Sequence, residues 1–192
     1  MIKTRKELLY YLERDKLALG KRYRYPRIIG DEIWRFQIIY RKYEYYRNNL
    51  DKKYFYPIAI FYKIRFKRIS IKLGYSIPIN TIGPGLSLAH YGTIVINGNS
   101  KIKNNCRIQE NVTIGATNGS EKAPRIGNNV FIGSGAKIIG DIDIADDICI
   151  GSGAVVVDSF MQSGITIAGV PAKKISDNNS HSNLNQDIFK GE

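Results

Sequence analysis

The chain has 192 residues, of which 43% are hydrophobic and 24% charged, enough to bury a core and too many to be disordered throughout. No run approaches the roughly 18 apolar residues of a membrane span, and the basic N-terminus leads into no hydrophobic signal segment. The two cysteines, Cys106 and Cys149, are too few for a disulfide framework or a four-thiolate metal site. We therefore expect a cytoplasmic protein with reduced thiols.

The formal charge of +12 is unevenly distributed, because 20 of the 29 lysines and arginines and 12 of the 13 tyrosines precede residue 76. By contrast, 15 of the 18 glycines follow residue 75, where the charge is close to neutral. We divide the chain into a basic, Tyr-rich α-helical domain (1–74), a repeat domain (75–175) and a polar C-terminal tail (176–192).

Three helices are predicted in the first domain. Thr4 and Glu7 have the spacing of a capping box, which predicts a helix over 6–19. Asp31 can cap a second helix that reaches about residue 49, whose dense apolar residues require that much of its surface be covered. Pro57 suits the first turn of a third helix. Apolar residues recur along this third helix at spacings of four, three and four, namely Tyr62, Phe66, Ile69 and Leu73.

Arginine, lysine and tyrosine alternate over residues 40–47, and this pattern allows three interpretations. It can form a solvated helical face that partly serves oligomer contacts, or a surface for an anionic membrane at its inner face or for an acidic glycan. It can also bind nucleic acid through phosphate contacts and base stacking. No recognised nucleic-acid motif accompanies it, so we expect no nucleic-acid partner.

From residue 96 onward the sequence repeats with a period of six. Aliphatic residues occupy one phase and miss only the position of Ser120: Ile96, Ile102, Ile108, Ile114, Ile126, Ile132, Ile138, Ile144, Ile150 and Val156. Small or aliphatic residues stand two positions earlier, such as Cys106, Val112, Val130, Ala136, Ile142, Ile148 and Ala154. This period fits short strands joined by corners in a triangular solenoid, with Gly or Asn adopting positive φ near the corners.

The missed position predicts a loop over residues 117–125, because Ile114 and Ile126 stay in phase across it. The loop is either a neutral insertion or an element of a ligand site. Of the two histidines, His181 lies in the polar tail and is expected to be solvated. His90 stands just before the regular repeat, where a structural and a catalytic role are both open.

Three motifs together resemble the serine acetyltransferase branch of the hexapeptide acyltransferases over residues 74–176. They are His90-x-Gly92-Thr93-Ile94-Val95-Ile96, Val112-Thr113-Ile114-Gly115-Ala116-Thr117 and Ala168-Gly169-Val170-Pro171-Ala172-Lys173-Lys174. Residues 1–73 resemble the shortened helical cap of acetyltransferases associated with surface polysaccharide synthesis. The resemblance implies a mainly β fold, a left-handed parallel β-helix with a small N-terminal α-helical domain. It also implies a homotrimer, with pairing of trimers through the N-terminal helices as an option.

The resemblance implies that acetyl-CoA is the co-substrate and that no metal is needed. By this analogy His90 is the general base that takes the proton of an acceptor hydroxyl during direct transfer. Residues expected along the acetyl-CoA groove are Gly115, Ala116, Thr117, Gly133, Ser134, Gly135, Gly151 and Ala168, with Lys137, Lys173 and Lys174 near phosphates. Residues expected around the acceptor are Ala89, Tyr91, Asn111 and Lys122.

The acceptor pocket departs from the serine acetyltransferase pattern. Ala89 stands where that family has an aspartate before the histidine, and Lys122-Ala123 replaces its Arg-His. The family's upstream acidic partner of the histidine is missing from residues 75–80, and Glu110, about one coil beyond His90, can replace it. An amino-acid acceptor needs paired charges when desolvated. These departures predict a sugar acceptor, in a surface or capsular polysaccharide or its precursor.

The alternative acceptor is L-serine, in a reaction that feeds cysteine biosynthesis. A zinc hydratase of the same fold needs about three histidine ligands, so one usable histidine argues against it. A non-enzymatic scaffold is the third alternative, in which His90 would be dispensable.

Overall fold

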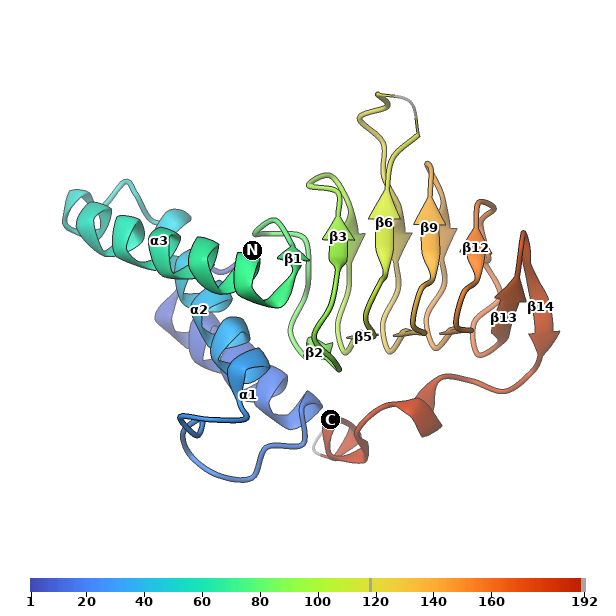
Figure 1. Ribbon diagram of the computed structural model, residues 1–192, viewed down its shortest axis with the longest axis horizontal. Helices are drawn as coiled ribbons and strands as arrows, with labels where there is room; N and C mark the ends of the chain where they lie inside the picture. The colour runs from blue at the N-terminus through green and yellow to red at the C-terminus, as the bar shows by residue number, and fades with distance from the viewer. Residues whose placement is uncertain (118, 191–192) are drawn as a thin grey trace.

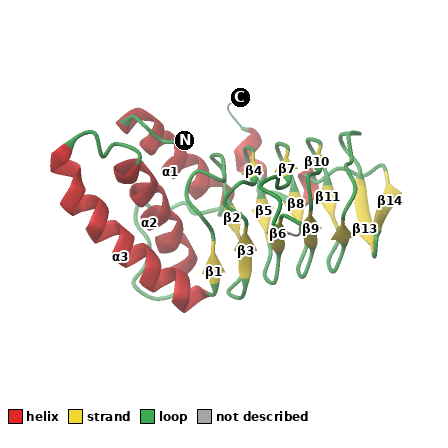
Figure 2. Cartoon of the chain, turned by 90° about the horizontal axis from the view of Figure 1, so that it is seen from above, coloured by secondary structure: helices red, strands yellow, loops and turns green. Residues whose placement is uncertain are grey.

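The computed structural model describes residues 1–117 and 119–190, in which helices precede a stack of short strands (Figure 1). Helices α1 (Arg5–Ala18), α2 (Glu32–Arg47) and α3 (Tyr56–Leu73) gather at one end, with the 3-10 turn η1 (Lys53–Phe55) just before α3. Figure 2 shows them beside the strands, with α3 at the outer edge. Within the described ranges, no helix is both long and apolar enough to cross a membrane.

The beginnings of the helices follow the sequence with one exception. The capping box of α1 is confirmed, since Thr4 accepts from the backbone N–H of Glu7 at 3.1 Å and the Glu7 carboxylate accepts from that of Thr4 at 2.8 Å. Pro57 lies in the first turn of α3, as expected. Asp31 precedes α2, but its side chain does not cap that helix. It accepts a hydrogen bond from Lys21 instead.

A buried cluster of charges lies at the centre of the helical domain. Arg41 of α2 is fully buried, and its Nε donates to Asp15 of α1 at 2.8 Å. Its Nη1 donates to the carbonyl of Ile82, at the start of the strand region, at 2.8 Å. The cluster therefore joins two helices to the first coil. Tyr40 is also fully buried, so this part of the 40–47 segment is not exposed for stacking on a base.

The strands form three sheets that the chain visits in turn, coil after coil. The first sheet contains β1 (Tyr75–Ser76), β3 (Ile94–Ile96), β6 (Thr113–Gly115), β9 (Lys137–Ile139) and β12 (Val155–Val156). The second contains β4 (Lys101–Ile102), β7 (Arg125–Ile126) and β10 (Asp143–Ile144). The third contains β2 (Ser87–Leu88), β5 (Arg107–Ile108), β8 (Phe131–Ile132), β11 (Cys149–Ile150), β13 (Thr166–Gly169) and β14 (Ala172–Ser176). Pairing is parallel except between β13 and β14. The expected helical domain followed by a parallel solenoid is therefore confirmed.

The core of the solenoid is the aliphatic column that the repeat predicts. All ten residues of that phase are buried, and the most exposed of them, Ile102, shows 4% of its surface. Burying an aliphatic side chain of this size stabilises a fold by about 1.5–3 kcal/mol. The column runs from coil to coil, as when Ile138 lies between Ile114 and Val156 in the first sheet.

One corner of the solenoid carries a ladder of polar side chains. Asn105, Asn129 and Asp147 have φ values of 58°, 55° and 61°, so each stands in the left-handed region. Asn105 donates to Asn129 at 2.8 Å, and Asn129 donates to Asp147 at 2.9 Å. The expectation that corner residues adopt positive φ is confirmed, and the ladder ties successive coils together.

The expected loop lies between β6 and β7 and projects from the solenoid (Figure 1). Ile114 pairs with Ile138 and Ile126 with Ile144, so the coils on both sides of the loop keep their register. Asn118 of this loop lies outside the described residues.

The tail runs back along the solenoid to the helical domain (Figure 1). It contains the 3-10 turns η2 (His181–Asn183) and η3 (Gln186–Phe189), and its Leu184 and Ile188 are buried together with Ala18 of α1. The side chain of His181 is 40% exposed, as expected for the tail, but its Nε2 atom also lies 2.7 Å from the carboxylate of Asp147. Residues 191–192 of the tail lie outside the described residues.

Candidate active site

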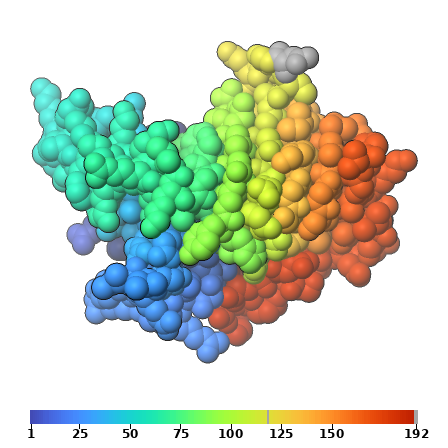
Figure 3. All heavy atoms as spheres, in the orientation of Figure 1, coloured from blue at the N-terminus to red at the C-terminus, as the bar shows by residue number. Residues whose placement is uncertain are grey.

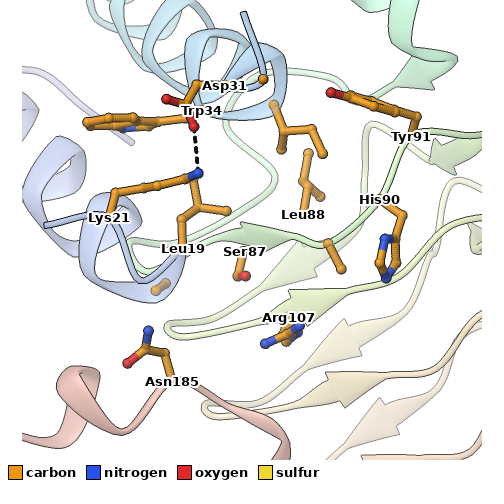
Figure 4. Close-up of a pocket in the computed structure, with 14 residues that line it drawn as sticks. Leu19, Lys21, Asp31, Trp34, Ser87, Leu88, His90, Tyr91, Arg107 and Asn185 are labelled. Carbon is orange, nitrogen blue, oxygen red and sulfur yellow. Dashed lines mark hydrogen bonds and ion pairs between the residues drawn. The ribbon is translucent and has the colours of Figure 1, made fainter. Parts of the chain in front are cut away.

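A pocket of about 490 Å³ opens where the helical domain meets the first coils of the solenoid. Strand β2 and the turn after it supply Ala89, His90 and Tyr91, and the start of α2 faces them across the pocket (Figure 4). Asn185 of the tail also lines it. The pocket thus brings together three residues that the sequence singled out.

His90 is held through its backbone, while its ring is exposed to the pocket. The hydroxyl of Tyr75 in β1 donates to the His90 carbonyl at 2.6 Å. Tyr75 is 4% exposed, and burial raises the pKa of its phenol well above the ordinary value, so this hydroxyl remains a donor at neutral pH. The position of His90 in the first coil is therefore fixed from the solenoid core.

Glu110 lies one coil further along and interacts electrostatically with His90. The Ser134 hydroxyl donates to Oε1 of Glu110 at 2.6 Å, and this bond lowers the pKa of the carboxyl, with a further contribution from His90. The other oxygen, Oε2, is buried and has no hydrogen-bond partner within the described residues. An ionised carboxylate with a free oxygen near the imidazole can orient that ring, which is the role predicted for Glu110.

Arg107 in β5 is a pocket residue that the sequence reasoning missed. It pairs in register with Ser87 of β2, which puts its guanidinium group in the pocket that contains His90 (Figure 4). The Arg107 side chain is half-buried, and its Nε is buried without a partner in the described part of the chain. The signal was present in the repeat, because residues one coil apart on the same sheet are neighbours.

The helical side of the pocket carries a satisfied pair of charges. Asp31 accepts from the ammonium of Lys21 at 2.5 Å, from the backbone N–H of Arg27 at 2.8 Å and from the hydroxyl of Tyr23 at 2.9 Å. Burial opposes ionisation of Asp31, but these hydrogen bonds outweigh it and lower the pKa of the carboxyl. Among the described residues, Asp31 forms an ion pair with Lys21 and none with Arg107.

Of the residues expected around the acceptor, Ala89 and Tyr91 lie in the pocket, and the Tyr91 hydroxyl donates to Glu32 of α2 at 3.0 Å. Asn111 stands at the corner beyond Glu110 with φ of 59°. Lys122 is not brought to this pocket. It forms an ion pair of 2.9 Å with Asp141 beside the loop.

Among the residues expected to contact acetyl-CoA, two glycines have a structural reason of their own. A Cβ on Gly133 would lie 2.6 Å from the backbone nitrogen of Ser152, and one on Gly151 would lie 2.8 Å from the Cβ of Ala168. Close stacking of the coils therefore requires glycine at both positions. Gly115, Ala116 and Thr117 lie at and after the end of β6, whereas Gly133, Ser134 and Gly135 form the corner between β8 and β9.

The three lysines expected near phosphates differ in their surroundings. Lys137 donates to the carbonyl of Asn111 at 2.6 Å and to the hydroxyl of Thr113 at 3.2 Å, which uses two of the three donors of its ammonium. Lys173 and Lys174 are exposed on β14, and Lys174 forms an ion pair with a neighbouring aspartate at 2.5 Å. Strand β14 lies five strand intervals from β2 in the third sheet, or about 24 Å. A ligand that contacts both the lysines on β14 and His90 beside β2 must therefore be elongated.

Among the described residues, no group of three or more His, Cys, Asp or Glu side chains is placed to hold a metal ion. Cys106 is buried, and burial raises the pKa of its thiol, so it is not a reactive nucleophile.

Comparison with known proteins identifies relatives of the solenoid and of its helical domain. The family model described as bacterial transferase hexapeptide (six repeats) matches residues 123–158. A serine acetyltransferase of Buchnera aphidicola subsp. Schizaphis graminum is 39% identical over 113 residues, which are 57% of this chain and 43% of that protein. The chain therefore spans less than half the length of this relative.

Solved structures extend the similarity over most of the chain. The serine acetyltransferase of Neisseria gonorrhoeae has a TM-score of 0.69 and 27% identity, over 93% of this chain and 70% of that one. The serine acetyltransferase of Brucella abortus strain S19, solved in complex with coenzyme A, has a TM-score of 0.66 and 26% identity, over 91% of this chain and 70% of that one.

These relatives contradict the acceptor predicted from the sequence, because they are serine acetyltransferases and not polysaccharide O-acetyltransferases. The predicted sugar acceptor was based on the charged residues that are missing at Ala89 and Ala123. The structure shows that Arg107, from the next coil, brings a cation to the pocket of Ala89. The resemblance itself is confirmed: the chain is similar to the hexapeptide-repeat transferases and, over a larger part of its length, to serine acetyltransferases.

Proposed function

We propose that the chain is an acetyl-CoA-dependent O-acetyltransferase whose acceptor is the hydroxyl group of L-serine. The similarity to serine acetyltransferases supports both substrates, and the coenzyme A complex of the Brucella enzyme supports the donor. The pocket at His90 supports the chemistry, because it combines an imidazole with a cation that has no partner among the described residues.

His90 acts as the general base, since histidine is the side chain best suited to move protons at neutral pH. It takes the proton of the serine hydroxyl while the oxygen attacks the thioester carbonyl. When the C–S bond breaks, the proton passes to the leaving sulfur, so the products are O-acetylserine and free coenzyme A. Glu110 orients the imidazole through its unpartnered oxygen, and Tyr75 holds the backbone of His90.

The observation that carries the proposed acceptor is the unpartnered guanidinium of Arg107 in the same pocket as His90. Serine carries a carboxylate close to its hydroxyl, and an arginine binds a carboxylate through two parallel hydrogen bonds. Arg107 therefore anchors the carboxylate while His90 reaches the hydroxyl.

The donor is proposed to lie along the solenoid, with its phosphates toward Lys173 on β14 and its thioester toward His90. We also propose that the coils are left-handed and that the chain works as a homotrimer, as the resemblance implies. The molar mass in solution, measured by light scattering, tests the assembly.

The central test measures thiol release from acetyl-CoA with L-serine as acceptor in wild type, His90→Ala, Arg107→Gln and Arg47→Gln. We expect His90→Ala to lower kcat about a thousandfold. We expect Arg107→Gln to raise the KM for serine by about 10- to 100-fold, because a charge-assisted hydrogen bond is lost, and to leave the KM for acetyl-CoA unchanged. Arg47→Gln removes an exposed arginine outside the pocket and is the matched control.

Absence of serine turnover in a folded, CoA-binding wild type would overturn the proposed acceptor. Equal KM values for serine in Arg107→Gln and Arg47→Gln would remove Arg107 from the acceptor site and leave the acetyl transfer standing. Unchanged kcat in His90→Ala would overturn the proposed mechanism as a whole.

A further inference from the structure

Helix α3 has one face that packs on the protein and one that is exposed. Phe66, Ile69 and Leu73 lie against the core of the helical domain and the first coil. The opposite side of α3 lies at the outer edge of the molecule (Figures 2 and 3). We call this side the α3 face, and it consists of Tyr56, Ile60, Phe61, Lys63, Ile64, Arg65, Lys67, Arg68, Ile71 and Lys72.

The centre of the α3 face is a stripe of exposed isoleucines. Ile60, Ile64 and Ile71 follow one another at spacings of four and seven, which places them along one line of the helix. They are 42%, 48% and 69% exposed, and Phe61 beside them is 52% exposed. Single exposed apolar residues are ordinary on a protein surface, whereas several gathered on one side of a helix indicate a contact surface.

Cations border this stripe on both sides. The helical period puts Lys63 and Lys67 on one side of the isoleucines and Arg68 and Lys72 on the other. None of these four makes an ion pair within residues 1–117 and 119–190, and the sequence contains no Asp or Glu between Asp51 and Glu110. The surface is therefore positively charged without compensation nearby.

The apolar stripe continues into a hollow of about 230 Å³ between α2 and α3. Leu50, Ala59 and Ile60 form part of its lining, and the cations Arg47 and Lys63 stand among the other residues that line it. The hollow therefore enlarges the apolar area of the α3 face. Like the isoleucine stripe, it is apolar in its lining and has cations beside it.

We propose that the α3 face docks onto the surface of an anionic lipid bilayer. Its isoleucines enter the boundary between headgroups and acyl chains, while the bordering lysines and arginines meet lipid phosphates. A second copy of this face would bring cations against cations. A nucleic acid would neutralise the cations but would leave the isoleucines in water. A bilayer with anionic headgroups satisfies both parts of the face.

The test is co-flotation of the full chain with vesicles of phosphatidylcholine alone or with roughly 30% phosphatidylglycerol. We expect binding only to the anionic vesicles, with high salt weakening it. Lys67→Gln/Arg68→Gln should weaken binding about 25-fold, at about fivefold for each cation near the surface. Ile64→Ser should weaken it about tenfold.

The control variant is Lys101→Gln/Lys103→Gln, which removes two exposed cations from the solenoid, one in β4 and one just after it, and should bind like wild type. Circular dichroism and thiol release from acetyl-CoA verify that each variant is folded. Equal binding to both vesicle types, or equal losses in the two double variants, would overturn the proposal. A smaller molar mass of Ile64→Ser in solution, with unchanged vesicle binding, would instead assign the α3 face to contacts between copies.

Discussion

The solenoid and the helical domain fill their interiors with different chemistry. In the solenoid, each coil adds an aliphatic side chain to a column of similar residues, so every position resembles the one above and below it. In the helical domain, Arg41, Asp15 and Glu44 are buried together between helices and the first coil. The solenoid thus depends on many equivalent contacts, whereas the helical domain adds one unique cluster of charges to its buried apolar side chains.

The largest effect on stability is expected where the unique cluster is broken. Arg41→Met removes the cation and leaves Asp15 and Glu44 buried without it, which should lower the free energy of unfolding by about 3–5 kcal/mol. Urea denaturation followed by circular dichroism measures this change.

Arg47→Met, on the exposed end of the same helix, is the control and should cost less than about 0.5 kcal/mol. A similar loss in both variants would show that the buried cluster is not what holds the helical domain together.

A smaller effect is expected at one position of the aliphatic column. Ile138→Ala should cost about 3 kcal/mol, because it opens a cavity between Ile114 and Val156, while Ile138→Val should cost about 1 kcal/mol. Ile175→Ala, at a residue that is 64% exposed, should be nearly neutral. If the alanine and valine variants had the same stability, the column would not be close-packed.

The smallest effect concerns pH and the ion pair at the edge of the pocket. The pKa of Asp31 is lowered in the folded state, so its contribution to stability is complete above the ordinary carboxyl value of 3.8 and is lost as the pH falls through the lowered value. Wild type should therefore lose more stability than Asp31→Asn when the pH falls from 6 to about 3. Urea midpoints of the two proteins over this range provide the measurement, and parallel curves would contradict it.

The solenoid could be predicted from the sequence, because a strict period of six identifies the buried residues of the column without knowledge of distant contacts. The buried column, the loop that keeps register and the left-handed corner residues all follow from this period. The hydrogen bonds of Asp31 to Lys21 and Tyr23 could not be predicted from the sequence, because they depend on the conformation of the irregular segment between α1 and α2. The packing of His181 on Asp147 also depends on where the tail runs.

The site was only half predicted for a related reason. His90 stands in a motif, and Glu110 is found by counting about one coil beyond it. Arg107, in contrast, matters through its neighbour across the sheet, Ser87. The period of the repeat contains that information, because it fixes the outward-facing residues of each coil as well as those of the core. A coil-by-coil map of outward positions would have placed a cation beside His90.

The return of the tail to α1 changes how the solenoid should come apart. A stack of coils in which each contacts only its neighbours can fray from its free end, one coil at a time. Here the segment after the last coil is pinned at Leu184 and Ile188 to the domain that precedes the first coil. Arg14 of α1 reinforces the attachment by donating to the carbonyl of Ile188 at 2.9 Å. Opening of the last coil is thereby coupled to release of the tail from the first helix, which favours cooperative unfolding of the chain as one unit.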